Sequence, residues 1–143
     1  MVIIMFFKLK ELREDNDLTQ NDVSKLLLIT RQNYSRWETN EKVIPLKHLV
    51  NLCNYYKVSL DYITNLSKKN NYNKIELNKI EIGRRIKEFR NTNNISQKQL
   101  SVFLNTTQST ISAYEAGETL ILTSFAYQIC KQYNISFDWL CNI

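Results

Sequence analysis

The chain has 143 residues, of which 43% are hydrophobic and 23% are charged, and this composition excludes disorder throughout the chain. It contains only two glycines and one proline, too few for the tight turns of a strand-rich fold, so the sequence predicts an all-α protein. A single histidine excludes a catalytic imidazole pair, and the isolated glycines exclude a glycine-rich phosphate loop. The net charge of +5 is compatible with nucleic acid as a partner.

The cysteines and the N-terminal run bear on the compartment of the protein. Cys53, Cys130 and Cys141 have no C-x-x-C spacing, which indicates reduced thiols and no zinc site, with Cys141 as the one that can be exposed. The apolar run Val2–Phe7 is too short for a signal peptide, and no segment is long enough to span a membrane. We therefore expect a cytoplasmic protein, and a start at Met5 stays open as an alternative.

Five short helices are predicted in the first part of the chain. The first covers about Phe6–Asp15, and Pro45 begins the fourth, where its missing N–H does no harm. Residues with hydroxyl side chains are candidate N-caps for the second, third and fifth helices: Thr19, Thr30 and Ser59. The short turn Leu28–Thr30 joins the second and third helices into a helix-turn-helix.

The second half of the chain repeats the first. With an offset of 77 residues, positions 9–66 align with 86–143 without a gap, and 17 of the 58 pairs are identical. Two unrelated segments of ordinary composition would be identical by chance at roughly one position in fifteen. The candidate caps recur at the aligned positions: Ser96, Thr107 and Ser136. The chain is therefore an internal duplication of a unit of about 60 residues.

The duplication predicts two domains and a connection between them. The domains cover residues 1–67 and 82–143, and a polar linker covers residues 68–81. Asn78, with Glu81 three residues further on, is a candidate cap for a helix that begins in the second half of the linker.

Each domain resembles the lambda-repressor-like family of helix-turn-helix proteins, of the Cro/CI or XRE type. The runs that carry the resemblance are LREDNDLTQNDVSKLLLITRQNYSRWE and IGRRIKEFRNTNNISQKQLSVFLNTTQSTISAYEAGE, continued by LCNYYKVSLDYI and ICKQYNISFDWL. Together they cover nearly the whole chain outside the linker and the first few residues. The resemblance implies two tandem five-helix domains, each with its third helix in the major groove of double-stranded DNA.

The resemblance also implies which side chains contact bases. In the first domain they are Arg31, Gln32, Asn33 and Arg36, and in the second they are Gln108, Ser109 and Thr110. Arginine can bond bidentately to guanine, and glutamine or asparagine to adenine. The second domain has shorter side chains and Ala113 at its fourth position, so we expect it to recognise sequence less sharply. The aromatic and aliphatic residues on the opposite face are predicted to lie in the core: Tyr34, Trp37, Ile111 and Tyr114.

Further matched positions are implied to contact phosphates or to support the third helix. The phosphate contacts are Gln20, Thr30, Lys42, Gln97 and Thr107, with Arg84, Arg85 and Lys98 as further candidates. Two ion pairs, Arg13–Glu38 and Arg90–Glu115, link the first helix of each domain to the third. The family often has glycine in the turn where this chain has Leu28 and Asn105. Leucine tolerates the left-handed conformation poorly, which indicates either an altered turn or a cost of about 1 kcal/mol accepted for packing.

These features together predict a sequence-specific DNA-binding regulator of transcription that acts as a repressor. Its partner is double-stranded DNA, bound either by a homodimer or by one chain acting as a pseudo-dimer. We expect no cofactor, no metal and no enzymatic activity, because the chain lacks an acid–base constellation, a nucleophile motif and a set of metal ligands. An antitoxin or anti-regulator that acts mainly through protein contacts is the alternative.

Overall fold

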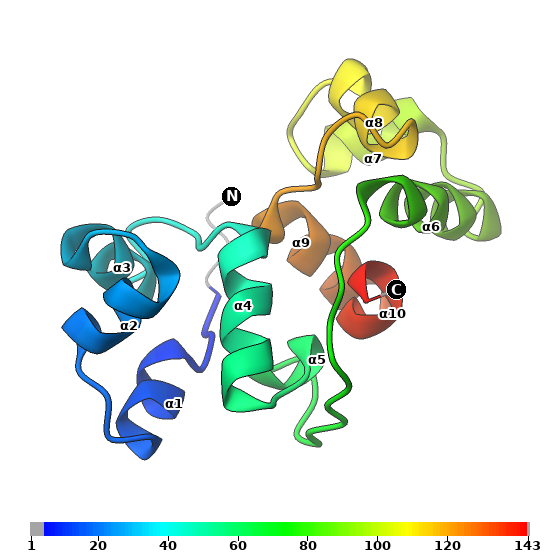
Figure 1. Cartoon of the computed structure of the whole chain (residues 1–143). Coiled ribbons are helices and arrows are strands. Elements are labelled where there is room, and N and C mark those ends of the chain that lie inside the picture. The colour runs from blue at the N-terminus through cyan, green and yellow to red at the C-terminus, as the bar shows by residue number, and fades with distance from the viewer. Residues whose placement is uncertain (1–4, 143) are drawn as a thin grey trace. The chain divides into compact units, whose positions relative to one another are not determined.

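The computed structural model describes residues 5–142, which form two compact units, one ending at Ile75 and one beginning at Glu76 (Figure 1). The first unit contains α1 (Leu9–Asp15), α2 (Gln20–Leu27), α3 (Arg31–Glu38), α4 (Leu46–Tyr56) and α5 (Leu60–Ile63). The second contains α6 (Lys79–Thr92), α7 (Gln97–Phe103), α8 (Gln108–Glu115), α9 (Thr123–Tyr133) and α10 (Phe137–Cys141). Within residues 5–142 every regular element is a helix, which confirms the predicted all-α class. None of these helices is long and apolar enough to cross a membrane.

Side-chain caps determine where most of the helices begin. Thr19 and Ser96 each form a capping box with the residue three positions further on, Asp22 or Gln99. The hydroxyls of the remaining predicted caps each accept a hydrogen bond from the third backbone N–H of their helix: Thr30, Ser59, Thr107 and Ser136. Each cap satisfies a backbone donor that has no partner within the helix, so the predicted caps are confirmed.

The core of each unit lies behind its third helix. On α3, Tyr34 is 0% and Trp37 is 9% exposed, and their counterparts on α8 are equally buried, as the sequence predicts. The His48 ring lies against Trp37 with the ring centroids 5.3 Å apart. Cys141 is 0% exposed, so the expectation that it can be exposed is wrong. Each large apolar side chain buried in this way contributes about 1.5–3 kcal/mol to stability, and burial fixes which face of the third helix points outward.

The turn between the second and third helices has the same geometry in both units. Leu28 has φ 56° and Asn105 has φ 55°, so both residues adopt the left-handed conformation. The altered turn considered for Leu28 is therefore wrong. Packing does not explain the strained leucine either, because its side chain is 92% exposed.

The first helices of the two units differ in length. The sequence predicts a first helix that starts near Phe6, but α1 begins only at Leu9, whereas α6 spans 14 residues. Phe6 occupies the position equivalent to Gly83, where α6 passes against the backbone of α8. A Cβ on Gly83 would clash with the carbonyl oxygen of Tyr114 and lie 2.9 Å from that of Glu115. A phenylalanine cannot enter such a helix crossing, and this accounts for the later start of α1.

Part of the connecting segment packs on the first unit. The Asn54 side chain on α4 accepts a hydrogen bond from the N–H of Ile75 at 2.9 Å and donates one to the carbonyl of Ile75 at 3.0 Å. The Tyr72 hydroxyl also donates to Asn54, and the Asn70 side chain accepts from the N–H of Ser59. Ile75 is 3% exposed as a result. Three residues further along the chain, the Asn78 side chain caps α6.

Candidate nucleic-acid interface

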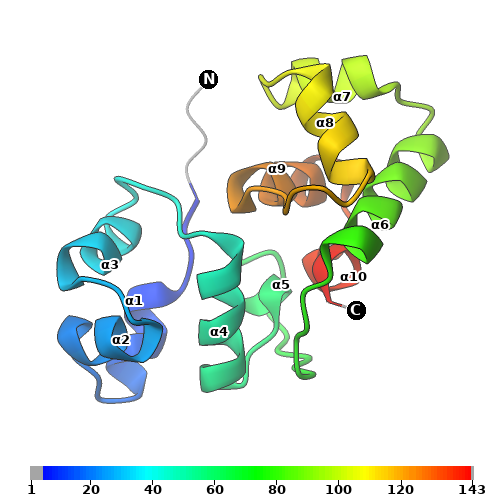
Figure 2. The same ribbon diagram turned by 45° about the horizontal axis from the view of Figure 1, so that its top comes forward.

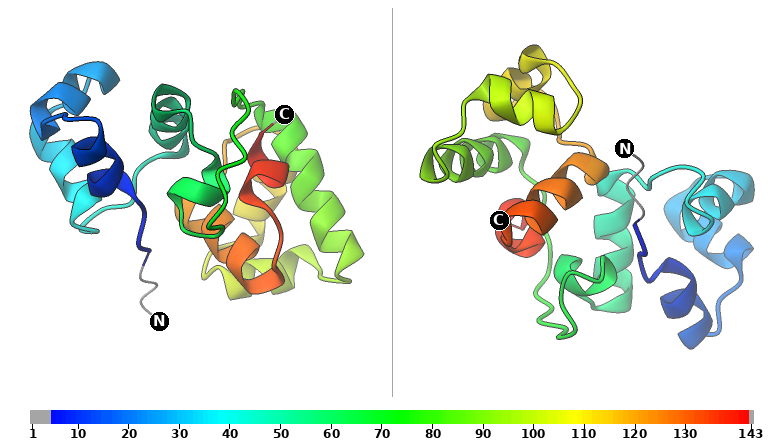
Figure 3. Two further views of the ribbon diagram at one scale, coloured as in Figure 1. Left: turned by 90° about the horizontal axis from the view of Figure 1, so that it is seen from below. Right: turned by 180° about the vertical axis from the view of Figure 1, so that it is seen from behind.

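The helix-turn-helix of each unit consists of two helices in direct contact, α2 with α3 and α7 with α8 (Figures 2 and 3). In the first unit, burial of Tyr34 and Trp37 turns the opposite face of α3 outward. Arg31, Gln32 and Asn33 are exposed on that face, in the first turn of the helix. Within residues 5–142 their side chains make no hydrogen bond or ion pair, so their polar groups are available to a ligand.

Two further predicted contacts of the first unit, Arg36 and Lys42, lie beyond this turn. Arg36 is half-buried, and its Nε lies 3.9 Å from Oε1 of Glu41. The Arg36 side chain is 42% exposed and that of Glu41 is 65% exposed, so solvent screens this long ion pair and it contributes little. Lys42 is exposed in the segment that follows α3.

The second unit presents a shorter set of polar side chains. Gln108 and Ser109 are exposed in the first turn of α8. The hydroxyl of Thr110 lies 2.9 Å from that of Thr107, which also caps the helix, so the helix itself engages both hydroxyls. Ala113 stands where the first unit has Arg36. The second surface therefore offers one long amide side chain where the first offers two guanidinium groups and two amides.

A carboxylate at the end of α3 connects three parts of the first unit. Glu38 accepts hydrogen bonds from Arg13 Nε at 2.7 Å and from Arg13 Nη2 at 3.1 Å. It also accepts one from the amide nitrogen of Gln20, the first residue of α2, at 3.1 Å. Arg13 Nη1 donates to the carbonyl of Leu18 at 2.9 Å, which includes the α1–α2 loop in the same network. These bonds hold the two helices of the helix-turn-helix at a defined angle.

The second unit repeats this network with the same geometry. Arg90 donates to Glu115 at 2.8 and 3.0 Å, and Gln97 donates to Glu115 at 3.2 Å. Arg90 also donates to the carbonyl of Ile95 at 2.9 Å. Gln20 and Gln97, both predicted to contact phosphates, are thus oriented by a glutamate, and each amide group keeps one donor hydrogen for a further partner.

Both members of the Arg13–Glu38 pair are charged at neutral pH. Burial raises the pKa of Glu38, but the hydrogen bond and positive charge of Arg13, together with the Tyr34 hydroxyl and the Gln20 amide, bring the pKa below its ordinary value. The hydrogen bond to Glu38 raises the pKa of Arg13 further above its already high value. The side chains are only 12% and 4% exposed, so removing one partner would leave a charge in a largely dry site.

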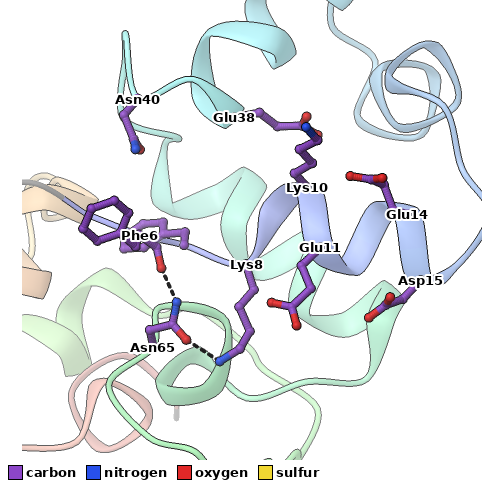
Figure 4. Close-up of a pocket in the computed structure, with 10 residues that line it drawn as sticks. Phe6, Lys8, Lys10, Glu11, Glu14, Asp15, Glu38, Asn40 and Asn65 are labelled. Carbon is purple, nitrogen blue, oxygen red and sulfur yellow. Dashed lines mark hydrogen bonds between the residues drawn. The ribbon is translucent and has the colours of Figure 1, made fainter.

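In each unit a basic side chain connects the first helix to the end of the last helix, a contact that the sequence did not predict. Lys8 Nζ donates to the Asn65 side chain (Figure 4). It also donates to the carbonyl of Tyr62 at 3.0 Å and lies 4.1 Å from the centre of the Tyr62 ring. A cation at this position neutralises the carbonyl end of α5. Extending the alignment of the repeat by one position, to Lys8 and Arg85, pairs two cations and would have indicated this contact.

Arg85 makes the equivalent contact in the second unit. Its guanidinium donates to the carbonyls of Trp139 and Asn142 and lies 5.7 Å from the centre of the Trp139 ring. Arg84, its neighbour, pairs with Glu81 at 2.8 Å. Arg85 therefore binds the end of α10, whereas the sequence predicts it as a further candidate for a phosphate contact.

Comparison with known proteins assigns both units to one family. A helix-turn-helix family profile matches residues 9–63 and matches again over residues 86–140. YobD of Bacillus subtilis (strain 168), described as an uncharacterized HTH-type transcriptional regulator, is 35% identical over 60 residues. That alignment covers 42% of this chain and about half, 54%, of the length of YobD. The two matches of the profile extend over most of the chain, which therefore belongs to the Cro/CI-type helix-turn-helix family and carries two of its domains in tandem.

Proposed function

We propose that the chain is a sequence-specific DNA-binding regulator of transcription, and that it represses the genes whose promoters it occupies. The first turn of α3 carries the proposal. This turn carries three exposed polar side chains that have no protein partner within residues 5–142: Arg31, Gln32 and Asn33. The opposite face of the helix is packed in the core. These groups match the donors and acceptors of guanine and adenine in the major groove. Family membership and the similarity to a transcriptional regulator support the same conclusion.

The two units are proposed to recognise unequal half-sites. Arg31, Gln32 and Arg36 suit a half-site that contains guanine and adenine. In the second unit, Gln108 is the one long side chain at these positions, so its half-site specifies fewer bases. The operator is then an asymmetric sequence with a well-defined half and a degenerate half.

Phosphate contacts are proposed to set the position of each helix on the duplex. Gln20 and Gln97 begin the second helix of each unit, where backbone N–H groups are free and the helix dipole favours an anion. Lys42 adds a charge beyond α3, and the cap residues Thr30 and Thr107 complete the set. Such contacts give affinity without sequence preference.

Selection of bound sequences from a pool of random DNA duplexes tests this function. A sequence-specific regulator enriches one strong half-site and one weaker half-site at a fixed spacing. Affinity should fall steeply with salt, because each neutralised phosphate releases counterions. A reporter gene placed behind the selected sequence then distinguishes repression from activation. Failure to enrich any sequence, with weak and salt-insensitive binding, would instead favour the protein-binding alternative.

The number of chains on one operator follows from light scattering of the purified complex. One chain on both half-sites indicates a pseudo-dimer built from the tandem units. Two chains on one operator indicate a homodimer, in which each chain uses one of its units on the DNA.

A further inference from the structure

In the second unit, the first helix covers the end of the recognition helix. Three residues of α6 make this contact, and we call them the α6 clamp: Lys79, Ile80 and Gly83. Gly83 is buried where α6 crosses the last turn of α8, and any side chain at Gly83 would meet the carbonyl oxygens of Tyr114 and Glu115. α6 and α8 therefore approach each other backbone to backbone at this point.

The other two clamp residues contact the turn that follows α8. Lys79 Nζ donates to the carbonyl of Glu118 at 3.3 Å. Gly117, in the left-handed conformation at φ 73°, lies so close to Ile80 that a Cβ on this glycine would be 2.8 Å from the Ile80 Cα. The clamp thus restrains both the last turn of α8 and the residues directly after it.

The first unit has a hollow at the corresponding place. α1 begins at Leu9, and Phe6, the counterpart of Gly83, is 68% exposed. A hollow of about 560 Å³ is lined by Phe6, Lys10, Glu38 and Asn40, among others (Figure 4). Glu38 and Asn40 are the counterparts of Glu115 and Gly117, which α6 covers in the second unit. Among residues 5–142, no helix covers the end of α3 in the way that α6 covers the end of α8.

We infer that Gly83 is a positioning residue for base recognition by the second unit. By letting α6 lie against the last turn of α8, it sets the tilt of that helix and with it the position of Gln108 in the groove. An eight-residue helix is a rigid rod of about 12 Å, so a displacement of one end is carried to the other. The inference rests on the proposed function, because it gives the tilt of α8 a role in base recognition.

The test is Gly83→Ala in the full chain, compared with the wild type by selection from the random duplex pool. Positions of the operator that depend on the second unit are first identified as those whose preference is lost in Gln108→Ala. In Gly83→Ala, preference at those positions should fall about tenfold, within the range that a bidentate base contact provides. Preference at the half-site of the first unit should stay as in the wild type.

Two controls separate positioning from a loss of stability. Phe6→Ala changes the counterpart of Gly83 at an exposed site and should leave both half-sites unchanged. Ile129→Ala removes a fully buried side chain of α9 and should lower the melting temperature without changing base preference. If Gly83→Ala does not fold, the double variant Lys79→Ala/Ile80→Ala loosens the clamp from its solvent side and should also weaken preference at the second half-site.

Each outcome bears on the inference. If the wild type enriches two half-sites and the clamp variants enrich the same two with equal preference, Gly83 has no positioning role, although the proposed function stands. If Ile129→Ala alters base preference as much as the clamp variants do, the effect is one of stability and the inference is wrong. If the wild type enriches no sequence, the proposed function fails and the inference fails with it.

Discussion

Arg13 and Glu38 face each other through two hydrogen bonds, of 2.7 and 3.1 Å, between the first and third helices of the first unit. The same carboxylate receives the amide of Gln20, so one buried charge determines how α1, α2 and α3 meet.

Replacing Arg13 by methionine should destabilise the first unit by about 3 kcal/mol, because Glu38 would keep its charge without a cation in a site that is 4% exposed. Denaturant unfolding of the full chain measures the loss. Arg84→Met is the matched control, since the Arg84 side chain is 73% exposed and loss of its ion pair with Glu81 should cost about 1 kcal/mol or less. Equal losses for the two variants would contradict a structural role for the buried pair.

The stabilisation from Glu38 should depend on pH. Its pKa is lower in the folded protein than in the unfolded chain, so its contribution is fully present above the ordinary value of 4.5. The contribution is lost as the pH falls from the ordinary pKa of 4.5 to below the pKa of Glu38 in the folded protein. In this pH range the unfolded chain binds the proton more readily than the folded protein does. The difference in unfolding free energy between the wild type and Glu38→Gln should therefore shrink below about pH 4.5. A constant difference from pH 7 to pH 3 would contradict this account.

Leu28→Asn should stabilise the first unit by about 1 kcal/mol, since asparagine adopts the left-handed conformation more readily than leucine does. No packing is lost, because the leucine side chain is 92% exposed. The exchange in the opposite direction at the equivalent turn, Asn105→Leu, should destabilise the second unit by a similar amount. Thermal unfolding of both variants provides the measurement, and shifts of the same sign in the two would be inconsistent with turn strain.

The DNA contacts of the first unit should separate into two kinds. Arg31→Ala should relax base preference at one position by about 1–3 kcal/mol, since a bidentate contact to a base is lost. Lys42→Ala should weaken binding to all sequences alike and reduce the slope of log affinity against log salt by about 1. Titrations of the selected duplex and of a scrambled duplex at several salt concentrations distinguish the two effects. An unchanged base preference in Arg31→Ala would show that α3 does not contact bases in the proposed way.

The architecture could be predicted from the sequence because it depends on local and periodic patterns of residues. Hydroxyl residues such as Thr19 and Ser96 satisfy backbone donors within their own helix, so a cap can be predicted from a few neighbouring residues. The buried faces of α3 and α8 follow from apolar spacing. The duplication strengthened these predictions. A residue type that occurs at the same position in both copies has the same local role in each.

Other features depended on contacts between residues far apart in the chain. Whether the first helix could start near Phe6 depended on the backbone of the third helix, and the burial of Cys141 depended on the elements around it. The conformation of Leu28 was set by the turn that α2 and α3 require, against the preference of the residue itself.

By itself, the sequence determined two all-helical units with the same order of helices, because capping and apolar periodicity act within a few residues. Only the tertiary structure decided how the third helix of each unit is supported. Gly83 allows two helices to cross closely, and Phe6 does not. Such a steric effect acts between segments that are far apart in the chain, so no periodic pattern in the sequence indicates it.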